Sequence, residues 1–232
     1  MKLQVLADTE SVAQAGAEVI AQAARSAVEA RGSFTFAVSG GRTPWVMMHA
    51  LAKEALPWDA VHILQVDERA APAGDPDRNL THLRESLLAN APLPADNLHA
   101  MPVEEEDLAA AGAAYGRTLE AVAGAPPRID LVHLGLGPDG HTASLVPGDP
   151  VLQVTDAPVA ITGVYQGHNR MTLTYPVLDR ARAVLFIVTG EEKVDALAKL
   201  IKHDPTIPAG RVNPDHAVVI ADRAAAAGLD HG

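Results

Sequence analysis

Short apolar runs alternate along this chain with longer segments of helical periodicity, and this order constrains the fold more than any other feature. The strand-like runs are residues 34–38, 61–66, 131–136, 159–164, 171–175, 183–188 and 217–220. Helices are expected at 9–30, 44–55, 79–89, 104–122 and 191–201, with a last one near 222–227. Parallel strands need a long crossover, usually a helix, so the order predicts a mostly parallel sheet. Two adjacent runs around Gly167 instead favour a hairpin.

Length and composition favour one domain. The chain has 232 residues, of which 48% are hydrophobic, which is ample for a core. We find no internal repeat, low-complexity linker or convincing boundary. Residues 1–232 are therefore expected to form one α/β domain with three α/β/α layers. The segments 92–102 and 204–214 are rich in Pro and Asn and are predicted to be surface loops.

The net charge and the cysteine content exclude several classes of partner and of active site. The formal net charge is −11, from 29 acidic and 18 basic side chains, which argues against nucleic acid and anionic membranes as partners. The absence of cysteine excludes disulfides, thiolate metal sites and cysteine nucleophiles. No apolar run has the length of a membrane span, and the N-terminus lacks the apolar core of a secretory signal. We expect a cytoplasmic protein, with no obligate protein partner indicated.

In open α/β sheets, ligands bind beyond the carboxyl ends of the strands, and the first such end here is rich in glycine. Gly40, Gly41 and Arg42 follow the run 34–38, with Thr43 predicted as a helix N-cap and Pro44 as the first helical residue. A helix start of this kind binds phosphate readily through free N–H groups. The alternative is that the glycines merely turn the chain. No lysine follows as in a nucleotide-binding P-loop.

The second strand end carries charge. Asp67, Glu68 and Arg69 follow the run 61–66, and the next loop contains Asp75, Asp77, Arg78 and Asn79. Three charged side chains at a strand end indicate a functional role. The alternative is a solvated, salt-bridged turn, because clusters of charge are common on surfaces.

The third strand end carries the strongest chemical signal. After the run 131–136, three glycines surround Asp139 and His141, which supply a proton acceptor and a group to orient it. The alternative is an ordinary Gly-Pro-Asp-Gly turn. Gly135, Gly137 and Gly140 also fit G-x-G-x-x-G, but Pro147 soon breaks the helix that a dinucleotide site needs. We therefore do not expect an NAD site.

Two further basic residues lie at strand or helix starts. Arg170 begins the run before residue 175, and Lys193 lies on the first turn of the helix that follows Gly190. Both are candidates for anion binding, although solvated positions are the common alternative. His62 and His133 lie within apolar strands and are interpreted as packing or surface residues. No H-E-x-x-H or comparable spacing predicts a metal site.

Together these motifs resemble the 6-phosphogluconolactonase family. The matching segments, in the expected order over nearly the whole chain, are 39–44, 67–69 with Asn79, 135–144, Arg170 with Thr172 and Thr174, and 189–190 with Lys193. The resemblance implies a Rossmann-like fold shared with glucosamine-6-phosphate deaminase and ribose-5-phosphate isomerase. It also implies hydrolysis of 6-phospho-D-glucono-1,5-lactone to 6-phosphogluconate in the pentose phosphate pathway, without metal or organic cofactor.

One departure separates the lactonases from the related deaminases. Deaminases follow the histidine with a segment of the type Ile-Ala-Phe-Asn-Glu, whose glutamate helps catalysis, whereas this chain has Val146 at that position. Asp67-Glu68-Arg69 likewise resembles the corresponding segment of lactonases rather than the Asp-Glu-Tyr run of the deaminases. Deaminase or isomerase activity remains the enzymatic alternative. A noncatalytic sugar-phosphate sensor is the second alternative. Such a regulator would need a DNA-binding module, and we find no segment in this acidic chain for one.

The resemblance suggests a role for each candidate residue. We expect the 6-phosphate to bind Gly40, Gly41, Arg42 and Thr43 with help from Arg170 and Lys193. His141 would take a proton from the attacking water, oriented by Asp139 or Asp67. Arg69 or N–H groups of the glycine loop would stabilise the oxyanion. A covalent route through Ser39 or Ser144 is the alternative, but neither serine lies in a G-x-S-x-G elbow.

Overall fold

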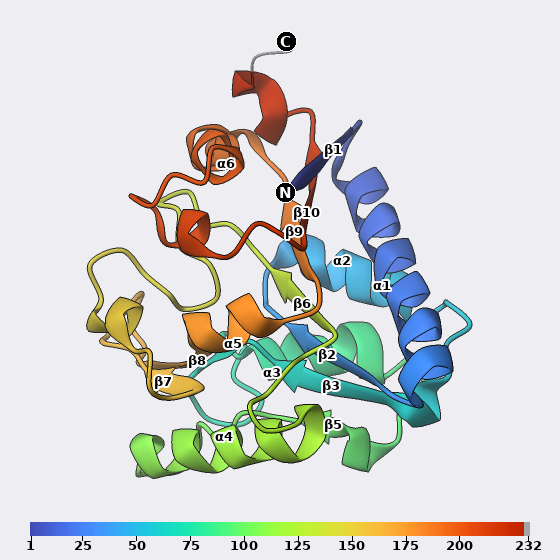
Figure 1. The fold of residues 1–232 in the computed structure, drawn as a ribbon, viewed down its shortest axis with the longest axis vertical. Helices are drawn as coiled ribbons and strands as arrows, with labels where there is room; N and C mark the ends of the chain where they lie inside the picture. Colours follow the sequence, from blue (N-terminus) through green and yellow to red (C-terminus); the bar gives the residue numbers. More distant parts are fainter. Residues whose placement is uncertain (230–232) are drawn as a thin grey trace.

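A computed structural model describes residues 1–229 and contains a seven-stranded sheet in which every pairing is parallel (Figure 1). In spatial order the strands are β1 (Lys2–Leu6), β10 (Ala217–Asp222), β9 (Val184–Val188), β6 (Leu131–Leu134), β2 (Phe34–Val38), β3 (Val61–Gln65) and β5 (Leu98–His99). The chain adds strands on one side of β2 and then, from β6 onward, on the other. This reversal is the kind of switch point at which α/β proteins bind ligands.

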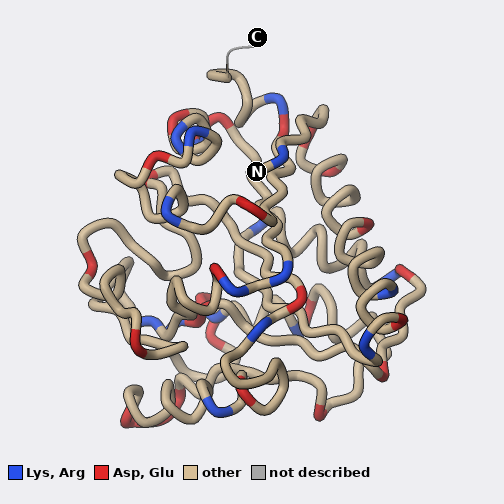
Figure 2. The backbone as a smooth tube through the Cα atoms, in the orientation of Figure 1, with Lys and Arg blue, Asp and Glu red and all other residues tan. Residues whose placement is uncertain are grey.

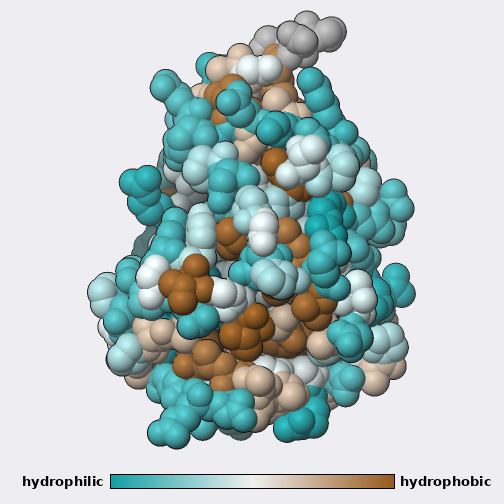
Figure 3. All heavy atoms as spheres, turned by 90° about the vertical axis from the view of Figure 1, so that its left-hand side faces the viewer, coloured by the Kyte–Doolittle hydropathy of each residue, from teal (hydrophilic) through white to brown (hydrophobic). Residues whose placement is uncertain are grey.

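A second, antiparallel sheet of three strands lies beside the main one. It has the order β4 (Asp67–Arg69), β8 (Arg170–Leu173) and β7 (Val159–Ile161). The hairpin predicted around Gly167 is confirmed as the β7–β8 pair, outside the main sheet. Figure 3 views the molecule from the side on which these strands lie in Figure 1, where apolar side chains form a group bordered by hydrophilic ones.

Helices cover both faces of the main sheet, which confirms the predicted α/β/α layers. On one face lie α1 (Thr9–Arg31), α2 (Arg42–Leu51) and α3 (Asn79–Leu83), the last continued by a π-helical turn over Arg84–Leu88. On the other lie α4 (Leu108–Ala123), α5 (Tyr175–Arg180) and α6 (Val194–Ile201). Because side chains alternate along a strand, Phe34 and Phe36 of β2 pack toward α1 while Ala37 packs toward α4. Both faces are therefore buried, as in other parallel sheets.

Local signals fix the helix ends. Asp8 caps α1 by accepting a hydrogen bond from Ser11 N at 2.8 Å, and Gly32 ends it with a φ of 79°. Asp107 caps α4 through Ala110 N at 3.0 Å, so that helix begins four residues later than the expected position 104. The remaining helical pieces are single 3-10 turns: Trp58–Ala60, Ala95–Asn97, Pro150–Gln153, Glu191–Lys193, Pro208–Arg211 and Ala225–Gly228.

Several expected elements were wrong. The segment 92–102, predicted as a loop, contains β5, and 204–214 contains a 3-10 turn. The run predicted over 171–175 ends at Leu173, and Tyr175 already begins α5. The last helix, expected near 222–227, is a single 3-10 turn over Ala225–Gly228. It begins later than expected because β10 continues to Asp222 beside β1. The strands β1 and β5, at the two edges of the main sheet, were not predicted.

Burial gives His133 of β6 a measurable effect on stability. It is fully buried, as the packing interpretation predicts, and burial lowers its pKa to about 3. An unfolded chain binds a proton at this residue near pH 6.5, so folding stability falls as pH falls from about 6.5 toward 3, by ~1.4 kcal/mol per pH unit. In urea unfolding between pH 6 and 5, we expect His133→Gln to make this slope shallower by about that amount. His49→Gln, at an exposed position of α2, should keep the wild-type slope. An unchanged slope in His133→Gln would contradict the prediction.

Candidate functional site

The loops after β2 and β6 meet at the switch point and border a cleft of about 590 Å³. A Cβ added to Gly135 would lie 3.9 Å from Gly40 O, so the two loops run side by side. All predicted site residues except Asp139 line this cleft: Gly40, Gly41, Arg42, Thr43, Asp67, Arg69, His141, Arg170 and Lys193. Asp139 reaches it through His141.

The glycine-rich loop after β2 ends in the start of α2. Gly41 caps the helix with a φ of 128°, a conformation that favours glycine, and Arg42 is the first helical residue. The predicted cap at Thr43 is therefore wrong, because the strand-to-helix turn is completed two residues earlier. Thr43 Oγ1 is instead 2.6 Å from Thr189 Oγ1, which joins α2 to the loop after β9. The first-turn N–H groups of α2 begin at the cleft, where they favour an anion.

The loop after β6 holds an imidazole against a carboxylate. His141 Nδ1 lies 2.6 Å from Asp139 Oδ1, and the backbone N–H of His141 donates to the same oxygen at 3.1 Å. Burial alone would raise the pKa of Asp139, but the nearby His141 and hydrogen bonds from His141 and Tyr165 hold it below its ordinary value. A proton on Nδ1 leaves Nε2 as the nitrogen that can accept another. Gly137 is required here, because a Cβ would overlap the His141 ring.

The second carboxylate considered as a partner of His141 has other partners. Asp67, 3% exposed, accepts hydrogen bonds from Ser39 Oγ at 3.2 Å and Ser144 Oγ at 2.6 Å. Asn79 Nδ2 donates to the Asp67 carbonyl at 2.9 Å. Both serine hydroxyls are thus buried donors to a carboxylate, with no imidazole among their hydrogen bonds in the described part of the chain. This geometry favours Asp139 as the partner of His141 and gives no activated serine.

A buried ion pair organises the segment between β4 and α3. Glu68 is 0% exposed and Arg78 is 1% exposed, with Glu68 Oε2 3.2 Å from Arg78 Nε. The Glu68 carboxylate also accepts hydrogen bonds from Gln65 Nε2 and from the backbone N–H groups of Arg69, Asn79 and Leu80, all at 2.8–2.9 Å. The interpretation of this segment as a solvated turn is therefore wrong. The pair fixes Asn79, whose Oδ1 accepts a hydrogen bond from the Arg69 guanidinium.

Several basic side chains face the cleft. Arg170 and Arg69 lie opposite each other across β8 and β4, and Arg170 is only 3% exposed, so the solvated alternative fails for it. Arg170 Nε has no hydrogen-bond partner among residues 1–229. Burial is the main cause that lowers the pKa of Arg170, and repulsion from Arg69 lowers it further. Burial also lowers the pKa of Lys193. Lys193 lies just before α6 rather than within it. Figure 2 shows basic and acidic residues interspersed along the chain. The cleft lining, by contrast, has four basic side chains, Arg42, Arg69, Arg170 and Lys193, and two acidic ones, Asp67 and Glu192.

The structure adds two cleft-side residues that the sequence patterns did not single out. Tyr165 donates from its hydroxyl to Asp139 Oδ2 at 3.2 Å, and Gln166 Oε1 accepts from Arg170 NH2 at 3.1 Å. Both lie in the β7–β8 turn. The sequence signal for the turn was present in Gly167, but no spacing rule shows which turn side chain points back to the cleft.

The described residues were also compared with what a dinucleotide site, a metal site and a membrane-spanning helix require. The segment after Gly140 forms turns, and no α-helix begins there before the 3-10 turn at Pro150–Gln153, so the dinucleotide pattern lacks its helix. Within residues 1–229, no three His, Cys, Asp or Glu side chains gather as a metal site. No helix in that range is long and apolar enough to cross a membrane.

Comparison with known proteins agrees with the motifs. Residues 7–221 match the family described as glucosamine-6-phosphate isomerases/6-phosphogluconolactonase. The 6-phosphogluconolactonase of Nostoc sp. is 34% identical over 235 residues, 98% of each chain. The structure of 6-phosphogluconolactonase from Thermotoga maritima has a TM-score of 0.85 at 28% identity, covering 95% of this chain and 98% of that one. A monomeric glucosamine-6-phosphate deaminase, with 17% identity, a TM-score of 0.86 and coverage of 98% and 100%, shares the fold. The chain therefore belongs to the family of glucosamine-6-phosphate isomerases and 6-phosphogluconolactonases.

Proposed function

We propose that this chain hydrolyses 6-phospho-D-glucono-1,5-lactone to 6-phosphogluconate, a step of the oxidative pentose phosphate pathway. The observation that carries the proposal is the His141–Asp139 pair at 2.6 Å beside a cleft that also holds Arg170, which is buried and whose Nε has no hydrogen-bond partner among residues 1–229. The substrate needs both features, because it carries a phosphate at one end and an ester carbonyl at the other. The relatives named 6-phosphogluconolactonase support the same substrate.

The phosphate would bind where positive potential is concentrated. Gly41 and Arg42 at the start of α2 supply N–H groups and one guanidinium, and Lys193 lies on the facing loop. Arg170, which is buried and has no partner at Nε within residues 1–229, adds a second guanidinium. An acidic chain can bind an anionic substrate only with such a local concentration of charge. We therefore assign phosphate binding to Gly40, Gly41, Arg42, Thr43, Arg170 and Lys193.

The reaction would proceed by direct attack of water. His141 Nε2 accepts a proton as the water oxygen bonds to C1, and the carbonyl oxygen becomes negative. Asp139 accepts the Nδ1–H bond and stabilises the cation that forms on the imidazole. The C1–O5 bond then breaks, and His141 returns the proton to the departing ring oxygen. Water is consumed, and one ester bond is cleaved. The carboxylic acid formed at C1 then releases the second proton of the water to solvent and becomes a carboxylate.

The developing oxyanion needs a donor in the cleft. The Arg69 guanidinium lines it and is held by Asn79 Oδ1, while the glycine loop supplies backbone N–H groups. One well-placed donor contributes about 3–4 kcal/mol to such a transition state. Asp67 supports the region by holding Ser39 and Ser144 in place. The assigned catalytic group is thus His141 with Asp139, assisted by Arg69, while Asp67 holds the two buried serines.

The deaminase alternative lacks a group that its chemistry requires. Val146, at the position of the deaminase glutamate, is a buried hydrocarbon with 7% exposure. A hydrocarbon can neither donate nor accept the proton needed for ring opening. This observation favours the lactonase within the family.

The test is a decay assay with enzymatically generated 6-phosphogluconolactone. The rate is measured with wild-type protein and with no protein, since the lactone also hydrolyses unaided, and glucosamine 6-phosphate is supplied in parallel. We expect faster decay with the protein and no ammonia release. Ammonia from glucosamine 6-phosphate without faster lactone decay would replace the proposal with deaminase activity.

Arg170→Ala should weaken substrate binding more than turnover. Losing one charged contact to the phosphate is expected to raise KM by about tenfold or more, while kcat changes little because His141 and Asp139 remain. Arg211→Ala is the matched control. Arg170 lies over the ring of Tyr165, with 5.0 Å from Cζ to the ring centroid, and Arg211 lies over the ring of Tyr175 at 4.6 Å. Arg211, however, is not among the residues that line the cleft. Steady-state kinetics of both variants decide the point, and an unchanged KM in Arg170→Ala would remove Arg170 from the phosphate site.

A further inference from the structure

Tyr165, in the turn of the β7–β8 hairpin, contacts both functional parts of the cleft. On one side lies the His141–Asp139 pair, and on the other lies Arg170. No other tyrosine among the described residues contacts either group. Tyr165 therefore connects the group that moves protons with a group that binds the phosphate.

The hydroxyl of Tyr165 completes the hydrogen bonding of the carboxylate. It donates to Asp139 Oδ2 at 3.2 Å, while Asp139 Oδ1 faces His141 Nδ1 at 2.6 Å. With both oxygens engaged, the carboxylate has a fixed plane. The Tyr165 ring also packs edge-on to the imidazole, with centroids 5.5 Å apart and an interplanar angle of 68°. Rotation of His141 is thus opposed from two directions.

The ring and its neighbour hold Arg170. Arg170 Cζ lies 5.0 Å from the centroid of the Tyr165 ring, within the range of a cation–π contact. Gln166 Oε1 accepts from Arg170 NH2 at 3.1 Å, and Gln166 Nε2 lies 3.5 Å from the Tyr165 hydroxyl. The guanidinium is therefore fixed by the turn on one face, and its Nε is left without a protein partner among residues 1–229.

The backbone of the turn sets this placement. Tyr165 N donates to His168 O at 2.9 Å, and the two residues between have positive φ, 50° at Gln166 and 87° at Gly167. This is a two-residue hairpin turn of the type that matches strand twist. Val164, the preceding residue, is 71% exposed, so successive side chains point outward and then back to the cleft. A glutamine in the left-handed region is uncommon and costs energy, which indicates that its position is held by its contacts.

We propose that Tyr165 is a positioning residue whose hydroxyl orients the Asp139–His141 pair and whose ring orients Arg170. This inference rests on the proposed lactonase function. The two roles belong to different parts of one side chain, so they can be separated by substitution. The hydroxyl should influence turnover, and the ring should influence substrate binding. Burial raises the pKa of Tyr165, so the phenol keeps its proton and remains a donor at neutral pH.

The experiment compares Tyr165→Phe with Tyr165→Leu in the lactone decay assay. The phenylalanine keeps the ring under Arg170 and removes only the donor to Asp139, so we expect kcat to fall about tenfold with KM unchanged. The leucine removes both contacts, so we expect the same fall in kcat together with a rise in KM of about threefold or more. The residue lies in a partly exposed turn, and thermal unfolding of each variant verifies the fold.

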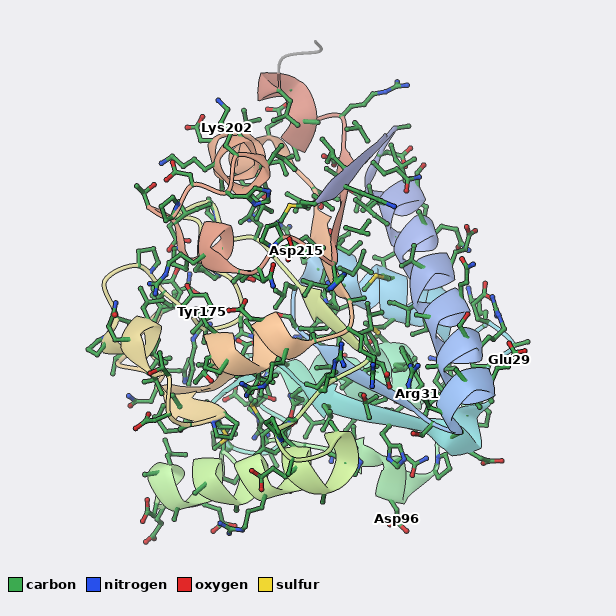
Figure 4. All side chains as sticks on the ribbon, viewed as in Figure 1. Glu29, Arg31, Asp96, Tyr175, Lys202 and Asp215 are labelled. Carbon is green, nitrogen blue, oxygen red and sulfur yellow. The ribbon has the colours of Figure 1, made fainter. Side chains whose placement is uncertain are left out.

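Tyr175→Phe is the matched control. Tyr175, labelled in Figure 4 at the start of α5, also donates from its hydroxyl, to Pro208 O at 2.9 Å, and also lies under an arginine, Arg211. It is outside the cleft, so kcat and KM should stay at wild-type values. Wild-type kcat in Tyr165→Phe, or equal effects of Tyr165→Phe and Tyr165→Leu on KM, would overturn the positioning role. If wild-type protein itself does not accelerate lactone decay, the proposed function is wrong, and the inference that rests on it is wrong as well.

Discussion

Replacing His141 with alanine is expected to lower kcat by about 10²- to 10⁴-fold, the usual contribution of a general base, while KM stays near its wild-type value. The turnover falls because no other imidazole is paired with a carboxylate at the cleft in the described part of the chain. Binding is retained because the basic groups and the start of α2 are untouched. The measurement is lactone decay at several substrate concentrations, corrected for the rate without protein.

His168→Ala provides the control for this prediction. His168 also faces an aspartate, with Nε2 3.1 Å from Asp77 Oδ2, and its side chain is 25% exposed against 22% for His141. It lies outside the cleft lining, so its loss should leave kcat unchanged. If His141→Ala protein turned over at the wild-type rate, His141 would not be the base, and water would have to be activated by another group.

Glu68→Gln is expected to destabilise the fold by about 3–5 kcal/mol, the cost of breaking a buried ion pair by neutralising one partner. Arg78 then keeps Glu104 as an ion-pair partner, but the Glu104 side chain is 52% exposed. Arg78 is 1% exposed and keeps its charge, and the neutral amide gives it much weaker compensation. The new NH₂ group replaces one of the two carboxylate oxygens. It therefore faces either the backbone N–H donors of Arg69 and Asn79, which bond to Oε1, or that of Leu80, which bonds to Oε2. In urea or thermal unfolding, the variant should unfold well before wild type. Its KM or kcat should also change, because Asn79 and Arg69 lose their anchor.

The control uses the other partner of the same arginine. Glu104 Oε1 lies 2.9 Å from Arg78 NH1, but its side chain is 52% exposed. Exposed ion pairs contribute about 0–1 kcal/mol, so Glu104→Gln should change the free energy of unfolding by less than 1 kcal/mol. Equal effects of Glu68→Gln and Glu104→Gln would mean that burial does not govern the strength of this network.

The site was predictable from sequence where it is local. Asp139 and His141 are two residues apart, and the glycines that bend the backbone around them lie in the same segment, so their contact follows from the turn itself. The ends of β2 and β6 were also predictable, because apolar runs separated by helical segments indicate parallel strands with carboxyl ends at one edge. The start of α2 was misplaced by two residues, since Gly41 rather than Thr43 ends the turn.

Contacts between distant segments were not predictable. The strands β1 and β5 were not expected from the sequence, and they pair at the edges that β10 and β3 offer. The charged segment after β3 gave no sign that Glu68 and Arg78 would be buried together, because charges of this kind are solvated in most proteins. Tyr165 reaches Asp139 only because the hairpin folds over the loop after β6.

The sequence by itself determined the layered α/β/α arrangement, the glycine loops and the His141–Asp139 pair, because periodicity and short spacing act within a few residues. Only the tertiary structure decided which carboxylate faces His141, that Arg170 is buried with no partner at Nε in the part of the chain that the structure describes, and which side chain holds Arg170 in place. These depend on burial and on hydrogen bonds between segments far apart in the chain. Such interactions become strong when packing excludes water from them, and a local pattern of residues does not predict which groups will be packed together.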